Sequence, residues 1–287
     1  MTVHRTLRFL VCDAYPREGR DGLQRAAATL AGTLYERLLH RLEPAAAVDI
    51  LYPADVDVAL PSRSALPEYD GVVWTGSSLT IYHDSDPRVR RQIELAHAVF
   101  ASGIPSFGSC WAAQLSVTAV GGRCAANPKG REFGISRRIA LTAQGRAHPM
   151  YRGKPSVFDA FTSHADEATV LPPTAHLLAS NAFSRVQAVA IESQGAFWAV
   201  QYHPEYDLHE LARLTWCRIE KLVKLGFFLD RPAAERYVDQ LEVLHQDPSR
   251  KDIAWLLGID EDVMSEDVRL AEVRNWIERL VIPTMRQ

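Results

Sequence analysis

The segment IPSFGSCWAAQ, residues 104–114, is the most informative stretch of the chain. An apolar run ends at Phe107, and helix-forming residues begin directly after Cys110. A strand that turns sharply into a helix lifts one side chain above the carboxyl edge of a sheet, where open parallel sheets bind their ligands. The segment therefore predicts a nucleophile elbow with Cys110 at its tip, and the helix N-terminus favours the thiolate there.

Apolar runs and helical periodicity alternate along the first half of the chain. Strands are expected at 7–12, 48–52, 71–74 and 104–107, and helices at 21–42, 87–101 and 111–120. This alternation predicts an α/β fold of three layers, a flavodoxin-like, mostly parallel sheet with helices on both faces.

Beyond residue 130 the pattern changes to short strands with little helix between them. They are expected at 133–142, 156–162, 177–179, 188–192 and 197–202, before a helix at 208–225. We interpret them as a partly antiparallel extension of the same sheet, which completes a domain over residues 1–228.

Residues 229–287 have a wholly helical pattern and form a predicted C-terminal extension. About 60 residues is a small number for an independent core. We therefore expect this extension to pack on the main domain or on a second subunit, as in a homo-oligomer formed through its helices. Its large apolar side chains are expected to be buried: Trp255, Leu256, Leu257, Trp276 and Ile277.

Composition narrows the functional class. The 287 residues are 47% hydrophobic, enough for a large core, and the net charge of −3 gives no global basic footprint for nucleic acid. The four cysteines lack the spacing of a zinc site or a disulfide framework. A signal-peptide pattern, an apolar run of about 18 residues, and a G-x-G-x-x-G or P-loop motif are also missing. We expect a cytoplasmic protein without a cofactor or a metal, and with no membrane partner.

Two further segments add to the elbow. In FWAVQYHPE, residues 197–205, a strand delivers His203, and Glu205 follows two positions later. A nucleophilic thiol needs a base, and the base needs an orienting partner. In WTGSS, residues 74–78, a strand ends in small residues whose backbone N–H groups can help to form an oxyanion hole. Each segment alone has an ordinary structural interpretation, and their combination favours a catalytic triad.

The combination resembles the class I, triad-type glutamine amidotransferase domain. The matching segments are TGSS (75–78), GSCWAAQ (108–114) and QYHPE (201–205), within a resemblance that covers about residues 5–225. Two softer matches, REFG (131–134) and SHAD (163–166), are similar to the amidotransferase domain of GMP synthetase. His164 and Asp166 in the second match either line the site or hold a turn.

The resemblance implies a role for each matching residue. Cys110 would attack the side-chain amide of glutamine and form a γ-glutamyl thioester, while His203 takes the thiol proton and Glu205 orients His203. The backbone N–H groups of Ser77 and Trp111 would hold the oxyanion. Gly76 and Gln114 would contact the substrate.

Three functions stay open at this point. The first is a glutamine amidotransferase or glutaminase that supplies ammonia to a synthase or another acceptor subunit. The second is a γ-glutamyl peptidase or hydrolase on the same scaffold, because Trp111 and Ala113 depart from the family pattern beside the nucleophile. The third is a non-catalytic regulatory module that uses its helical extension to bind a partner.

Overall fold

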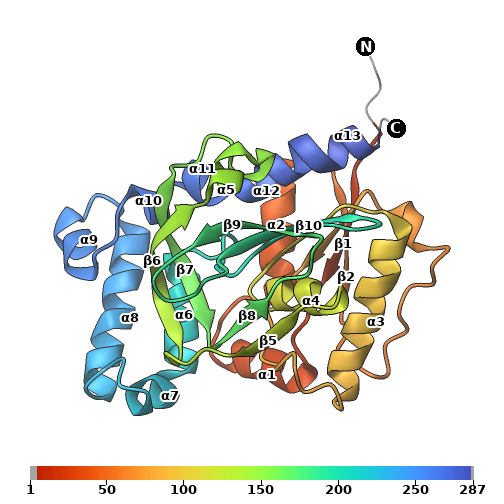
Figure 1. Cartoon of the computed structure of the whole chain (residues 1–287). Coiled ribbons are helices and arrows are strands. Elements are labelled where there is room, and N and C mark those ends of the chain that lie inside the picture. Colours follow the sequence, from red (N-terminus) through yellow and green to blue (C-terminus); the bar gives the residue numbers. More distant parts are fainter. Residues whose placement is uncertain (1–4, 286–287) are drawn as a thin grey trace.

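A nine-stranded mixed sheet forms the centre of the molecule in the computed structural model, which describes residues 5–285 (Figure 1). The strand order is β2-β1-β3-β4-β11-β10-β9-β6-β7. Its strands are β1 (Arg8–Cys12), β2 (Ala47–Leu51), β3 (Gly71–Trp74), β4 (Ser106–Ser109), β6 (Glu132–Leu141), β7 (Val157–His164), β9 (Ala175–Ser180), β10 (Ala188–Glu192) and β11 (Ala196–Val200). A small second sheet pairs β5 (Arg123–Ala126) with β8 (Asp166–Val170); the sequence analysis did not predict it.

The strands β2, β1, β3, β4 and β11 are parallel, and those from β10 to β7 are antiparallel. Parallel strands are buried on both faces, and every residue of β3 and β4 is buried accordingly. The helices in the first half of the chain are α1 (Arg17–Arg25), α2 (Ala31–Leu42), α3 (Pro87–Ser102) and α4 (Trp111–Ala119). Apolar residues of α3 and α4 pack on one face, and those of α2 on the other. The predicted three-layer α/β class, with its antiparallel extension, is confirmed.

Two helices predicted as continuous are each broken in two. The helix expected over 21–42 is interrupted at residues 26–30, where Ala27 has a φ of 56°. The second helix starts where the Asp13 carboxylate accepts the backbone N–H of Gly32 at 2.9 Å. The helix expected over 208–225 is divided into α6 (Leu208–Cys217) and α7 (Ile219–Lys224) at Arg218. Helical periodicity could not predict this break, because Asp13 lies 19 positions before Gly32 in the chain.

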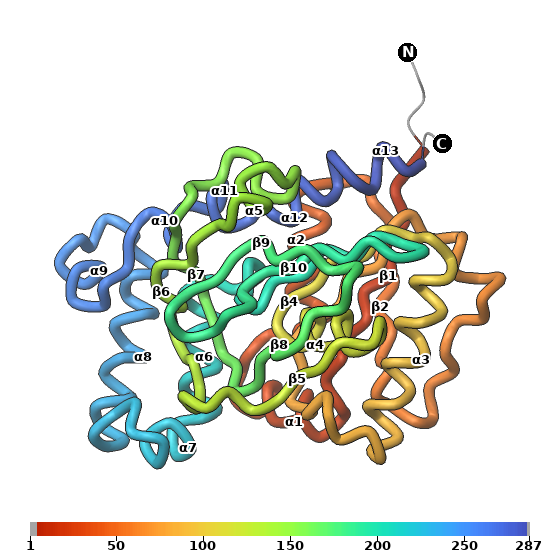
Figure 2. Tube along the Cα trace, in the orientation of Figure 1, coloured from red at the N-terminus to blue at the C-terminus, as the bar shows by residue number. Residues whose placement is uncertain are grey.

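The C-terminal helices pack on the rest of the molecule. They are α8 (Arg231–Gln246), α9 (Lys251–Leu257), α10 (Glu261–Met264), α11 (Glu266–Arg269), α12 (Ala271–Trp276), a π-helical turn (Ile277–Val281) and α13 (Ile282–Thr284). The remaining short helices are α5 (Ala143–Ala147) and the 3₁₀ turns Leu66–Glu68 and Pro149–Tyr151. Figure 2 shows the blue C-terminal trace rising along α8 beside α6, looping through α9, and then running through α12 to α13. Within residues 5–285, no helix is long and apolar enough to cross a membrane.

The expected burial of the extension holds for part of its apolar residues. Trp276 and Ile277 are buried, and the Trp276 ring lies 5.6 Å from Phe9 and 6.1 Å from Phe107 between centroids. The expectation is wrong for Trp255 and Leu256, which are 84% and 68% exposed, and Leu257 is half-buried. The short helix α9 packs through Ile253 and Ala254 on its opposite side.

Candidate active site

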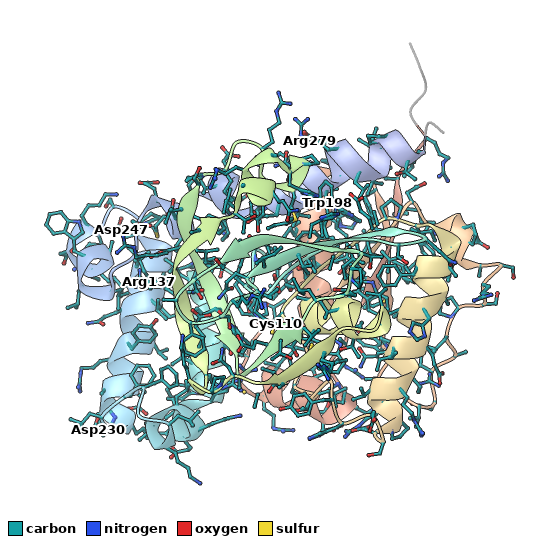
Figure 3. All side chains as sticks on the ribbon, in the orientation of Figure 1. Cys110, Arg137, Trp198, Asp230, Asp247 and Arg279 are labelled. Atoms are coloured by element: carbon teal, nitrogen blue, oxygen red, sulfur yellow. The ribbon has the colours of Figure 1, made fainter. Side chains whose placement is uncertain are left out.

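Cys110 occupies the turn between β4 and α4, near the middle of the molecule in Figure 3. Its φ of 55° and ψ of −103° are unusual for a residue with a side chain, and such backbone strain clusters at functional sites. Its N–H donates to the carbonyl of Val200 at 2.8 Å. A Cβ on Gly108 would lie 2.3 Å from Cβ of Ala112 and 2.7 Å from the carbonyl oxygen of Trp74. Glycine thus allows the close approach of strand and helix that the elbow requires.

His203 and Glu205 follow β11, which pairs in parallel with β4. The two carboxyl ends therefore lie side by side and bring His203 to Cys110. Nδ1 of His203 lies 2.7 Å from Oε1 of Glu205, and both side chains are buried. Gly76 completes this group, since a Cβ there would lie 3.1 Å from Cε1 of His203 and 3.7 Å from Cβ of Cys110. The His203 ring stacks on Tyr206, with ring centroids 4.1 Å apart.

Two further donors hold the Glu205 carboxylate. The hydroxyl of Ser109 donates to Oε1 at 2.8 Å, and that of Tyr35 donates to Oε2 at 3.2 Å. The sequence analysis missed both residues. Ser109 had a local signal, because it immediately precedes the predicted nucleophile at a strand end, whereas Tyr35 is 170 positions from Glu205 and had none.

The environment of His203 favours its charged form. Burial disfavours the imidazolium, but the Glu205 carboxylate and Cys110 outweigh burial and raise the pKa of His203 to about 9. An imidazolium beside a cysteine stabilises the thiolate, which is the nucleophilic form of the residue. The other cysteines differ: burial raises the pKa of Cys12 far above its usual value and that of Cys124 to about 11.

Cys110 opens onto a cavity of about 280 Å³. Three of the predicted residues line it with Cys110, namely Ser77, Trp111 and Gln114. Within residues 5–285, the backbone N–H groups of Ser77 and Trp111 donate to no backbone carbonyl, so both are available to a ligand. The Trp111 ring is buried in the core, where its Nε1 donates to Gln92 at 3.1 Å. Gln114 donates to the carbonyl of Asp166 at 3.2 Å.

His164 and Asp166 also line the cavity, and the structure gives His164 a fixed position. Its Nε2 lies 2.9 Å from Oε2 of Glu132, and its Nδ1 lies 3.0 Å from the carbonyl oxygen of Asp166. Although burial opposes the Glu132 carboxylate, hydrogen bonds from His164 and from neighbouring amides lower the pKa of Glu132. This buried pair supports one wall of the cavity.

Three basic side chains in the cavity wall were also missed by the sequence analysis: Arg131, Arg218 and Lys221. REFG (131–134) was noted only as a family match, and Arg218 was expected inside a continuous helix. No group of three or more His, Cys, Asp or Glu side chains within residues 5–285 is arranged to hold a metal ion.

The sequence of this chain is similar to proteins of one known family. The family model for glutamine amidotransferase class-I matches residues 34–214. A γ-glutamyl-L-1-hydroxyisopropylamide hydrolase from a Pseudomonas species is 33% identical over 289 residues, covering 98% of this chain and 95% of that protein. GMP synthase from Bordetella avium is 31% identical over 172 residues; the match covers 58% of this chain but only 31% of that enzyme.

Structural similarity extends over nearly the whole chain. A glutamine amidotransferase from Thermotoga maritima superimposes with a TM-score of 0.68 at 18% identity, covering 97% of this chain and 99% of that one. At this identity the likeness concerns the fold, and the sequence matches carry the family assignment. The chain belongs to the class I glutamine amidotransferase family.

Proposed function

We propose that this protein is a cysteine-dependent γ-glutamyl amide hydrolase. The observation that carries the proposal is that Cys110 lines a cavity while the buried His203 beside it is held 2.7 Å from Glu205. The similarity to a γ-glutamyl amide hydrolase continues through the C-terminal helices, whereas the GMP synthase match covers 58% of the chain. This difference favours the hydrolase over the amidotransferase as the first interpretation.

The proposed reaction has two halves. In the first, the Cys110 thiolate attacks the γ-carbonyl carbon, and His203 donates its proton to the departing amine as the C–N bond breaks. In the second, water attacks the γ-glutamyl thioester while His203 accepts a proton from it. The C–S bond then breaks and releases glutamate. The net reaction consumes one amide and one water and yields glutamate and an amine.

The remaining roles follow from position. Ser77 and Trp111 line the cavity with Cys110, and their backbone N–H groups are assigned to the oxyanion of each tetrahedral intermediate. Gln114 and Gly76 are both assigned to substrate contact. Gly76 also allows the chain to pack closely against the His203 ring. Glu205 keeps Nδ1 of His203 protonated, so that Nε2 exchanges the proton with sulfur, amine and water.

Glutamine is the smallest γ-glutamyl amide, and its hydrolysis for a synthase subunit is the second candidate function. The observation in its favour is the match of the central domain to GMP synthases. In that case ammonia, the leaving group, passes to a partner chain instead of solvent.

The deciding experiment combines labelling and kinetics. We expect the glutamine analogue 6-diazo-5-oxo-norleucine to modify Cys110 alone, as read by peptide mass spectrometry. Cys110→Ala should abolish labelling and hydrolysis, whereas Cys217→Ala, at an exposed cysteine, serves as the matched control. Faster hydrolysis of glutamine than of any substituted γ-glutamyl amide would select the amidotransferase. A lack of both labelling and hydrolysis would overturn the proposal.

A further inference from the structure

Two guanidinium groups converge beside the nucleophile. Arg218, between α6 and α7, donates to the Ser163 hydroxyl at 2.7 Å. Arg131, just before β6, donates to the same oxygen at 3.4 Å. The carbonyl oxygen of Ser163 accepts the Cys110 thiol at 3.8 Å, and both guanidinium groups line the same cavity as Cys110.

These guanidinium groups have neutral partners. Over residues 5–285, their hydrogen bonds go to the hydroxyls of Ser163 and Tyr15, and neither forms an ion pair with a carboxylate. Burial lowers the pKa of Arg131, and the charge of Arg218 lowers it further. Burial also lowers the pKa of Lys221, in the next turn of helix, and the charges of Arg131 and Arg218 lower it further. The planar guanidinium group of arginine can bind a carboxylate through two parallel hydrogen bonds. Two arginines that form no ion pair within the described part of the chain are therefore available to bind a carboxylate.

The charges of the cavity wall do not balance. Arg131, Arg218 and Lys221 are cationic, and Asp166 is the carboxylate that lines the same cavity. One oxygen of Asp166 already accepts the Tyr82 hydroxyl at 2.9 Å. A γ-glutamyl group carries one ammonium and one carboxylate, so its own charges cancel and leave the cationic excess in place. A second carboxylate on the substrate would reduce that excess in a partly desolvated site, where charge pairing is strong.

We propose that Arg131, Arg218 and Lys221 form an anion site that selects γ-glutamyl conjugates whose amine half bears a carboxylate, such as γ-glutamyl amino acids. This inference rests on the proposed function and names its substrate class. The two arginines bind carboxylate groups beside Cys110, and the more exposed Lys221 attracts the acidic amine half at the cavity rim. The Pseudomonas relative is named for an amide with a neutral hydroxyl group, so the two proteins would differ in their leaving amine.

The test uses two substrates that differ in one group. γ-Glutamyl-L-alanine has a carboxylate where γ-glutamyl-L-alaninol has a hydroxymethyl group. We expect kcat/KM to favour the alanine conjugate by about tenfold or more, as charged hydrogen bonds typically do. Arg218→Gln and Lys221→Met should each bring the ratio of the two kcat/KM values towards one. Lys224→Met, on the same helix and outside the cavity wall, should leave the ratio unchanged.

Binding to the inactive Cys110→Ala variant separates this inference from the proposed function. Calorimetry should show tighter binding of the alanine conjugate, and Lys221→Met in the same background should remove the preference. Equal hydrolysis and equal binding of both conjugates would overturn the anion site while the hydrolase stands. Preferential binding without any hydrolysis by the unmodified enzyme would support the anion site and overturn the hydrolase. If Arg218→Gln fails to fold, the exposed Lys221→Met variant still decides the outcome.

Discussion

The hydroxyl of Ser109 lies 2.8 Å from Oε1 of Glu205, the same oxygen that faces Nδ1 of His203. Ser109 is the last residue of β4 and directly precedes Cys110, whereas Glu205 follows β11. The hydrogen bond thus joins the ends of the two adjacent parallel strands that lead to Cys110 and His203. It fixes the carboxylate relative to the elbow and not only relative to His203.

Replacing Ser109 should weaken this positioning. In Ser109→Ala, Glu205 keeps His203 and Tyr35 as partners but loses the donor from β4. Loss of one such hydrogen bond costs about 1–2 kcal/mol, so we expect kcat to fall about tenfold with KM little changed. Steady-state kinetics with a γ-glutamyl amide measures the effect. Ser116→Ala, a buried serine of α4 that bonds to the carbonyl of Ala113, is the control. An unchanged kcat in Ser109→Ala would contradict the assignment.

Glu205 should control the pH dependence through His203. The pKa of His203 is raised from 6.5 to about 9, against the effect of burial. Protonation of His203 therefore stabilises the folded state: this contribution is complete below pH 6.5, declines as pH rises, and is lost above about pH 9. We expect kcat/KM to fall on the alkaline side near pH 9, because the imidazolium is then lost.

In Glu205→Gln the buried His203 loses its strongest supporting charge, so its pKa should drop. The alkaline fall in kcat/KM should move to lower pH. The free energy of unfolding near neutral pH should decrease by up to about 3 kcal/mol. Kinetic pH profiles and thermal unfolding between pH 6 and 10 test both effects. Superimposable profiles for the two proteins would show that Glu205 does not set the pKa of His203.

Gly76 should be required for activity more than for stability. A methyl group there would press on the His203 ring at 3.1 Å, whereas its other contacts are 3.7 Å or longer. In Gly76→Ala we expect kcat to fall at least tenfold, since a small displacement of His203, the proposed base, is costly. The thermal midpoint should change by only a few degrees. In the control Gly22→Ala, the new Cβ meets only Arg25, at 3.9 Å, and full activity is expected. Equal activity of the two variants would contradict the prediction.

A buried charge pair should tie the C-terminal helices to the site. Glu272 of α12 lies 2.6 Å from Nζ of Lys154 and accepts the Tyr202 hydroxyl at 2.5 Å, one residue before His203. Glu272→Gln would leave Lys154 unpaired in the interior, and we expect a loss of about 3–5 kcal/mol in the free energy of unfolding. Urea denaturation measures this loss. Glu278→Gln, exposed on the next turn, should change stability by less than about 0.5 kcal/mol. A similarly small effect of Glu272→Gln would show that the pair does not hold the helices.

The layered α/β class and the segments that carry the candidate site residues could be predicted because their signals are local, whereas the strand order could not. Residues 104–114 contain a strand end, a turn and a helix start within one short segment, and this determines where Cys110 projects. His203 and Glu205 also share one segment, and their mutual contact follows from its fold. By contrast, the division between residues 1–228 and 229–287 stays a prediction, since the extension shares its core with the sheet through Trp276.

By itself, the sequence determined the α/β layers, the elbow at Cys110 and the two residues that would serve it. These features depend on neighbours in the chain, through periodicity, turn chemistry and strand ends. Only the tertiary structure placed Tyr35 on Glu205 and brought Arg131 and Arg218 to Ser163. Such contacts join residues tens to more than a hundred positions apart, and they depend on how strands order in the sheet and where helices break. No local pattern records that packing, so the charge of the cavity appears only in the folded chain.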